Sequence, residues 1–144
     1  MRGARLLALM ALWAGAARGA DSKGMIIDIG PLRSSQGQVI VAVYDSEEGF
    51  PLNLNKAKLL RRVPVVGGQV ELSFEGLPYG SYAVAAIHDE NQNNTLDTSW
   101  IGLPKEGVAC SNGAHGRFGP PSFEDAIFPF QSEGQVVALK MVYL

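Results

Sequence analysis

Apolar and polar residues alternate with a period of two over several short stretches of the chain, which is the pattern of β-strands. The clearest stretch has Val70, Leu72 and Phe74 at every second position, with polar residues between them. Such a strand has one face in the core and the other in water. Residues 38–45 are apolar on both faces, which predicts a central strand covered from both sides. Six strands are predicted in this way, at residues 25–29, 38–45, 70–75, 81–88, 126–131 and 135–143, and a seventh near Val108.

Glycine and proline mark the connections between these strands. The segment from Gly76 to Gly80 is short and contains proline, so we expect strands 70–75 and 81–88 to form a hairpin. Residues 132–134 are expected to close a second hairpin between the last two strands.

The predicted fold is an antiparallel β-sandwich of the immunoglobulin or transthyretin type, with about seven strands and one short helix. The helix is expected within residues 53–62, because Pro64 prevents its continuation. A small closed barrel is the alternative. The 144 residues suffice for one domain of this kind, which we place at residues 21–144.

The first 20 residues have the order of a secretory signal peptide, in which two arginines precede an apolar run and small residues follow it. The run is about 12 residues long, short of the roughly 20 that a membrane-spanning helix needs. We therefore expect cleavage, export to the periplasm or the medium, and no transmembrane segment. Cleavage is expected after Ala16, Gly19 or Ala20.

Composition and charge argue against nucleic acid as a binding partner. The chain is 47% hydrophobic and 18% charged with a formal net charge of -2, and it lacks the clustered lysines and arginines that nucleic-acid binding requires. Cys110 is the only cysteine, so no disulfide can form within the chain. We expect a monomer in which Cys110 serves as a small buried apolar residue.

Oxygen-bearing side chains recur after strand 81–88 with the spacing of a calcium-binding loop. Counted from Asp89, potential ligands fall at positions 1, 3, 5, 7 and 9, and alternate residues of a tightly curled loop point inward. Position 6, usually glycine, is Asn94, which tolerates the left-handed conformation. Position 12 is Trp100 and not a bidentate glutamate, so the loop is not an EF-hand. The expected ligands are Asp89, Asn91, Asn93, the carbonyl of Thr95, and Asp97.

The expected calcium affinity is weak. With two carboxylates as the obligatory ligands, Kd falls in the range of extracellular modules, roughly 10⁻⁴ to 10⁻³ M. The alternative is a loop that binds no ion, because aspartate and asparagine side chains also stabilise turns by hydrogen bonding to the backbone.

A second unusual stretch, residues 102–125, is rich in glycine and proline. Loops of this length usually have a function. Arg117 and Phe118 would offer an anion contact and a flat apolar surface, which makes them candidate ligand-binding residues for an envelope polymer or protein. The alternative is structural, with Phe118 and Phe123 folding back to close one end of the sandwich.

Familiar catalytic motifs are missing from the sequence. It has no Gly-x-Ser-x-Gly turn, no phosphate-binding loop and no His-Glu-x-x-His. His88 and Asp89 are neighbours on a strand, so their side chains point to opposite faces and form no dyad. We expect a non-catalytic exported binding module whose 89–97 loop binds calcium weakly. The alternatives are a structural or envelope-interaction protein without metal, and a hydrolytic enzyme that uses His115 and nearby carboxylates.

A series of short motifs runs along the chain: Gly37-Gln38-Val39, Tyr44-Asp45, Gly49-Phe50-Pro51, Gly76-Leu77-Pro78, His88-Asp89-Glu90-Asn91, Leu96-Asp97-Thr98, Gly102-Leu103-Pro104 and Gly119-Pro120-Pro121-Ser122-Phe123. Together they resemble a family of exported bacterial proteins, domain-of-unknown-function family 2141. The resemblance extends over nearly all of residues 21–144 and implies an exported β-sandwich, with no established activity. Members usually have an aromatic residue shortly before Ser111-Asn112, where this chain has Ala109-Cys110.

Overall fold

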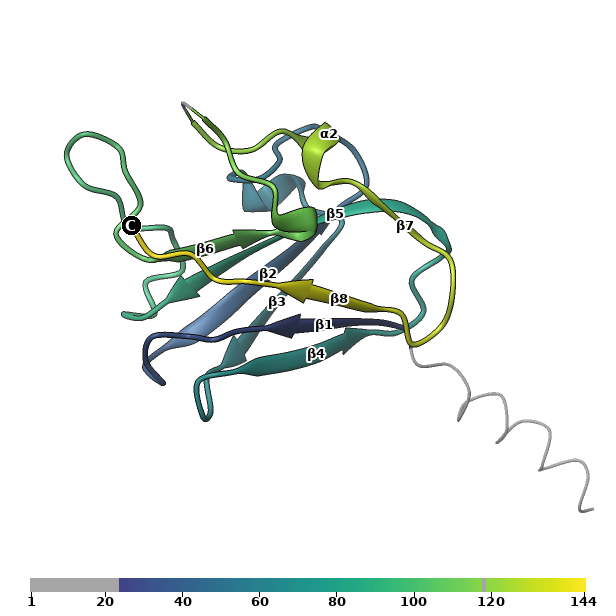
Figure 1. Cartoon of the computed structure of the whole chain (residues 1–144), viewed down its shortest axis with the longest axis horizontal. Coiled ribbons are helices and arrows are strands. Elements are labelled where there is room, and N and C mark those ends of the chain that lie inside the picture. Colours follow the sequence, from purple (N-terminus) through teal and green to yellow (C-terminus); the bar gives the residue numbers. More distant parts are fainter. Residues whose placement is uncertain (1–23, 118) are drawn as a thin grey trace, which may run out of the picture.

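The computed structural model describes residues 24–117 and 119–144, and Figure 1 shows them as two packed sheets. The predicted leader, residues 1–20, and Phe118 lie outside the described residues. The smaller sheet has three strands in the order β4 (Val70–Phe74), β1 (Met25–Ile29) and β8 (Val136–Leu139). The larger sheet has β3 (Leu59–Pro64), β2 (Gln38–Tyr44), β5 (Gly80–Asp89) and β6 (Gly107–Cys110) in that order, and β7 (Phe128–Phe130) pairs with the beginning of β5.

This arrangement confirms the predicted β-sandwich and excludes the closed barrel. The described residues contain eight strands, one more than predicted, and their pairs are antiparallel apart from β1 with β8. All of these strands and both clusters of buried apolar side chains lie within residues 24–144. A chain that begins at Asp21 therefore retains the whole core.

Alternate side chains of the strands fill the space between the two sheets, as their period of two predicts. On β1, Met25, Ile27 and Ile29 are fully buried there. The opposite face of β2 is buried as well, because a second cluster that includes Phe50 and Phe123 covers Tyr44. Burial on both faces confirms that β2 is a central strand.

Both predicted hairpins are wrong. The short connection after β4 carries the chain from the smaller sheet to the larger one, so β4 pairs with β1 while β5 pairs with β2. In the same way β7 pairs with β5 and β8 pairs with β1. The physical reason is burial: β5 is apolar on both faces and belongs inside the larger sheet, whereas β4 has one polar face and suits a sheet edge.

The predicted helix at residues 53–62 is also wrong. Only Leu54–Lys56 form one 3-10 turn, and Leu59–Pro64 form strand β3 at the edge of the larger sheet. Backbone pairing with β2 outweighs the weak helical spacing of this segment. The one short α-helix of the described residues is α2 (Phe123–Ala126), whose first turn is capped by the Ser122 side chain.

Candidate functional site

The candidate loop begins where β5 ends, and its first residue is an internal anchor. Asp89 is fully buried. Its Oδ2 accepts hydrogen bonds from the Asn94 backbone N–H and from Gln38 Nε2, both at 2.8 Å, and its Oδ1 accepts the Asn93 backbone N–H at 3.2 Å. These bonds pull the following residues into a tight curl.

The curl has the backbone conformation expected at its sixth position. Asn94 has φ of 65° and Gln92 has φ of 56°, so both lie in the left-handed region. Asn94 is fixed there because its Oδ1 accepts hydrogen bonds from Gln38 Nε2 at 2.9 Å and from Arg62 Nε at 3.0 Å. The predicted left-handed Asn94 is therefore confirmed.

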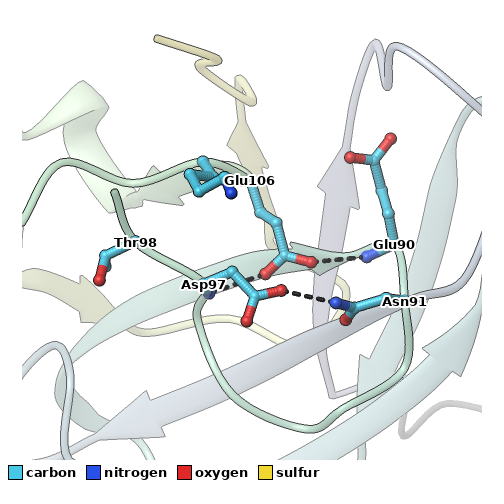
Figure 2. A pocket seen from close by; sticks show the side chains of 6 residues that line it. Glu90, Asn91, Asp97, Thr98 and Glu106 are labelled. Atoms are coloured by element: carbon cyan, nitrogen blue, oxygen red, sulfur yellow. Dashed lines mark hydrogen bonds between the residues drawn. The ribbon is translucent and has the colours of Figure 1, made fainter. Parts of the chain in front are cut away.

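Three of the five predicted ligand residues converge. Nδ2 of Asn91 donates to Asp97 Oδ2 at 2.7 Å, and Nδ2 of Asn93 donates to Asp97 Oδ1 at 2.6 Å. Figure 2 shows Asn91 and Asp97 facing each other across the loop. The Thr95 backbone N–H donates to Asn93 Oδ1 at 3.2 Å, and Asp89 is turned to the inner side of the curl. The structure therefore brings the side chains of Asn91, Asn93 and Asp97 together. Asp89 does not join them, because its carboxylate accepts backbone N–H groups on the inner side of the curl.

Glu106, just before β6, belongs to this site although its spacing in the sequence gave no sign of it. Only 5% of its surface is exposed, and its carboxylate accepts the backbone N–H groups of Glu90 and Asp97, each at 3.0 Å. Burial raises the pKa of Glu106, and the negative charges of Asp97 and Asp89 raise it further against the lowering effect of the two hydrogen bonds. Glu106 thus joins the two ends of the loop through the backbone of Glu90 and Asp97. It also places a third carboxylate near those of Asp89 and Asp97.

An open cavity of about 480 Å³ lies at this point. Its lining residues come from both sides of the loop: Glu90, Asn91, Asp97, Thr98, Lys105 and Glu106. In the described part of the chain, no three side chains of histidine, cysteine, aspartate or glutamate are grouped to hold a metal ion. A cation here would therefore draw on amide and backbone oxygens as well as carboxylates, which is the donor set that calcium accepts.

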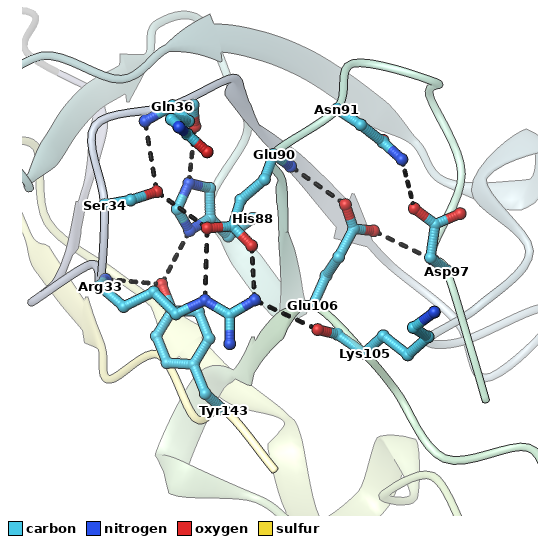
Figure 3. Close-up of polar contacts among 10 residues, drawn as sticks. All are labelled: Arg33, Ser34, Gln36, His88, Glu90, Asn91, Asp97, Lys105, Glu106 and Tyr143. Atoms are coloured by element: carbon cyan, nitrogen blue, oxygen red, sulfur yellow. Dashed lines mark hydrogen bonds and ion pairs between the residues drawn. The ribbon is translucent and has the colours of Figure 1, made fainter.

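A second polar network contacts the loop at Glu90, as Figure 3 shows. The Arg33 guanidinium forms an ion pair with Glu90, and Ser34 Oγ donates to the same carboxylate at 2.8 Å. The hydrogen bond from Arg33 holds the pKa of Glu90 below its usual value, and the bond from Ser34 adds to this effect. The Arg33 guanidinium also lies over the ring of Tyr143, 4.6 Å from its centre.

His88 is fully buried in this network. Its Nε2 lies 2.9 Å from the Gln36 carbonyl oxygen and its Nδ1 lies 2.8 Å from the Tyr143 hydroxyl. A carbonyl only accepts, so Nε2 carries the hydrogen in a neutral ring and Nδ1 accepts from Tyr143. His88 and Asp89 therefore have separate partners, which confirms that they form no dyad.

The other predicted residues lie apart from the loop. Arg117 is exposed, and Phe118 is outside the described residues. Phe123 folds back onto the outer face of the larger sheet, where its ring lies 5.8 Å from that of Phe50. His115 is exposed, with its Nδ1 3.1 Å from the Gly113 carbonyl oxygen. Cys110 is partly buried against the same outer cluster, and burial raises the pKa of its thiol to about 12.

Fold and site together define an antiparallel β-sandwich that presents a curled, polar loop after a central strand. The model of a family described as "Uncharacterized protein conserved in bacteria (DUF2141)" matches residues 27–138, and the chain belongs to that family. No curated protein and no solved structure matches the chain. Among the helices of the described residues, none is long and apolar enough to cross a membrane.

Proposed function

We propose that this protein is a non-catalytic, exported binding module whose 89–97 loop takes up one calcium ion. The observation that carries the proposal is the convergence of Asn91, Asn93 and Asp97 beside a cavity to which Glu106 adds a second carboxylate. Calcium takes six to eight oxygen ligands from carboxylates, amides, backbone carbonyls and water, and it tolerates irregular geometry.

The asparagine side chains supply the oxygens that carboxylates alone do not. Oδ1 of Asn91 accepts one backbone N–H, that of Asn93 at 3.3 Å, and Oδ1 of Asn93 accepts that of Thr95. An amide oxygen has two lone pairs, so each retains one for a cation. For calcium to bind beside Asp97, both amides would turn about their Cβ–Cγ bonds, so that Oδ1 replaces the Nδ2 group that now faces this carboxylate.

Electrostatics favours a cation at this position. Asp97 and Asp89 both raise the pKa of Glu106 through their charges, which means that the carboxylates repel one another. A divalent ion would offset this repulsion. Because Asp89 already accepts three hydrogen bonds, its part in the proposal is to hold the curl, and the affinity stays weak, with Kd of roughly 10⁻⁴ to 10⁻³ M.

Calcium titration of the chain that begins at Asp21 tests the proposal. We expect binding heat in calorimetry, and a melting temperature about 5 °C higher in excess calcium than in EDTA, since saturation at ten times Kd adds about 1.4 kcal/mol. The variant Asp97→Asn should lose both effects and remain folded, because Asp97 is partly exposed.

Asp45→Asn is the matched control. Asp45 directly follows Tyr44, the last residue of β2. The loop lies at the other end of this strand, where Gln38 pairs with Asp89. Its substitution should leave the calcium response unchanged. Absence of heat together with equal melting temperatures in EDTA and in calcium would overturn the proposal and favour a structural protein without metal.

A further inference from the structure

The segment Thr98–Pro104, directly after Asp97, forms a closed finger that projects beyond the sheets (Figure 1, the green connection between β5 and β6). Thr98 and Pro104 pair as an antiparallel bridge. The Ser99 backbone N–H donates to the Leu103 carbonyl at 2.7 Å, and the Gly102 N–H donates to the Ser99 carbonyl at 2.9 Å. The finger therefore has a defined shape of its own.

Large apolar side chains cover the tip of this finger. Trp100 is 96% exposed, Ile101 59% and Leu103 50%. Isolated exposed apolar residues are common on protein surfaces, but three within four residues at the tip of a projecting turn form a patch that water does not favour. The seven residues of the finger include no charged side chain.

We propose that this finger inserts into the surface of a phospholipid bilayer, with Trp100 at its tip. Lipid fits the finger for a chemical reason: at the bilayer surface, apolar side chains reach the acyl chains while backbone groups at the headgroup level still hydrogen-bond to water and headgroups. The backbone N–H groups of Ser99, Gly102 and Leu103 are paired inside the finger, the last with Ser99 Oγ at 3.2 Å. Those of Trp100 and Ile101 have no partner among the described residues, so we place them at the headgroup level, where water and phosphate oxygens accept them. Tryptophan favours the boundary between headgroups and acyl chains.

The alternatives fit the same residues less well. A sugar polymer needs hydrogen-bond partners beside the aromatic ring, and the tip around Trp100 offers aliphatic Ile101 and Leu103 instead. A protein partner would need a pocket shaped for the finger, whereas a bilayer accepts any narrow apolar projection. At the base of the finger Lys105 is exposed, and a lysine at this level can reach lipid phosphates while its aliphatic stem follows the apolar surface.

Trp100 is also the reporter for the test. In a chain that begins at Asp21 it is the only tryptophan, because the other is Trp13. We expect its emission to shift to shorter wavelength with millimolar phosphatidylcholine vesicles in EDTA, and the protein to sediment with them. The use of EDTA separates this test from the proposed calcium site, so either proposal can fail without the other.

Matched variants make the test specific. Trp100→Ser should weaken sedimentation with vesicles by about tenfold or more, and Leu103→Ser by a smaller factor, since each removes apolar surface from the contact. Val66→Ser is the control, because Val66 is 78% exposed on another turn and should leave binding unchanged. The melting temperatures of all three should match the parent chain. No emission shift and no sedimentation, or sedimentation that Trp100→Ser retains, would overturn the proposal, as would binding only to a polysaccharide or a protein.

Discussion

The core between the sheets and the loop 89–97 meet at one residue, since Asp89 ends β5 and begins the curl, yet different forces hold them. In the core, 20 buried side chains share the packing, and each touches several others. In the loop, three hydrogen bonds end on one carboxylate, Asp89, and two more on Glu106.

This difference implies different responses to mutation. A core residue lost from the sandwich leaves a cavity whose cost depends on volume. An anchor lost from the loop leaves backbone N–H groups without partners, and the cost depends on how many were paired. The core should therefore respond in proportion to size, and the loop in proportion to hydrogen bonds.

The largest effect is expected in the core. Phe130 is 1% exposed and its ring packs edge-on against Tyr79 at 5.2 Å. Phe130→Ala should lower the free energy of unfolding by about 4 kcal/mol, measured by denaturant titration, and Phe130→Leu by about 1.5 kcal/mol or less. Equal losses in the two variants would mean that volume does not govern this site.

A loss nearly as large is expected from a single loop residue. Asp89→Ala removes the acceptor for two backbone N–H groups and for Gln38, so it should lower the free energy of unfolding by about 3 kcal/mol. Asp97→Ala is the comparison, because the asparagine amides that it leaves unpaired are exposed to water, and it should cost about 1 kcal/mol or less. Similar losses in the two variants would contradict the role of Asp89 as the anchor.

The pH dependence of the two glutamates at the loop should have opposite signs. The pKa of Glu90 is lowered by Arg33, so its stabilising effect is present above the usual glutamate pKa and is lost as pH falls through the lowered value. The pKa of Glu106 is raised by burial, so the stability linked to its protonated form is present below the usual value and is lost as pH rises through the raised value.

Denaturant titrations from pH 3 to 7 measure this contrast. Glu90→Gln should cost about 0.5 to 1 kcal/mol near neutral pH, a small amount because the Arg33 side chain is 44% exposed, and the cost should decrease toward the acidic end. In an Arg33→Gln background that pH-dependent cost should be clearly smaller, because only the weaker effect of the Ser34 hydrogen bond and of His88 remains. For Glu106→Gln, the free energy of unfolding relative to the parent should instead improve as pH rises. Parallel profiles for the two variants would refute the assignment.

The sequence predicted the positions of the strands better than it predicted which strands pair with each other. A period of two reveals a strand and its buried face, and two apolar faces placed β2 in the interior. The period carries no information about which strand lies beside which, so the hairpins at Gly76 to Gly80 and at residues 132–134 were predicted from turn residues alone and were wrong. Strand β3 was missed because it is a sheet edge with Arg61 and Arg62 exposed, which hides its apolar pattern.

For the site, local spacing was informative and distant contacts were not. The oxygen spacing after Asp89 predicted the curl and the left-handed Asn94, because both depend on neighbouring residues. Glu106 lies 16 residues from the Glu90 backbone N–H that it accepts, and it reaches the site because β6 pairs with β5. Such a contact depends on the sheet as a whole, and no local pattern reveals it.

The smallest predicted effect tests whether the curl itself is under strain. Gln92 is exposed and has φ of 56°, a conformation that costs a residue with a side chain about 1 kcal/mol and costs glycine little. Gln92→Gly should therefore raise the free energy of unfolding by about 0.5 kcal/mol, once the greater flexibility of glycine in the unfolded chain is subtracted. Gln131→Gly, at an exposed position outside the positive-φ set, should lower it by about 0.5 to 1 kcal/mol. Thermal unfolding of the pair resolves the opposite signs. If both variants lower the free energy of unfolding equally, the curl carries no measurable backbone strain at Gln92. If Gln92→Gly raises it and Gln131→Gly lowers it, the hydrogen bonds to Asp89 hold Gln92 in a strained left-handed conformation.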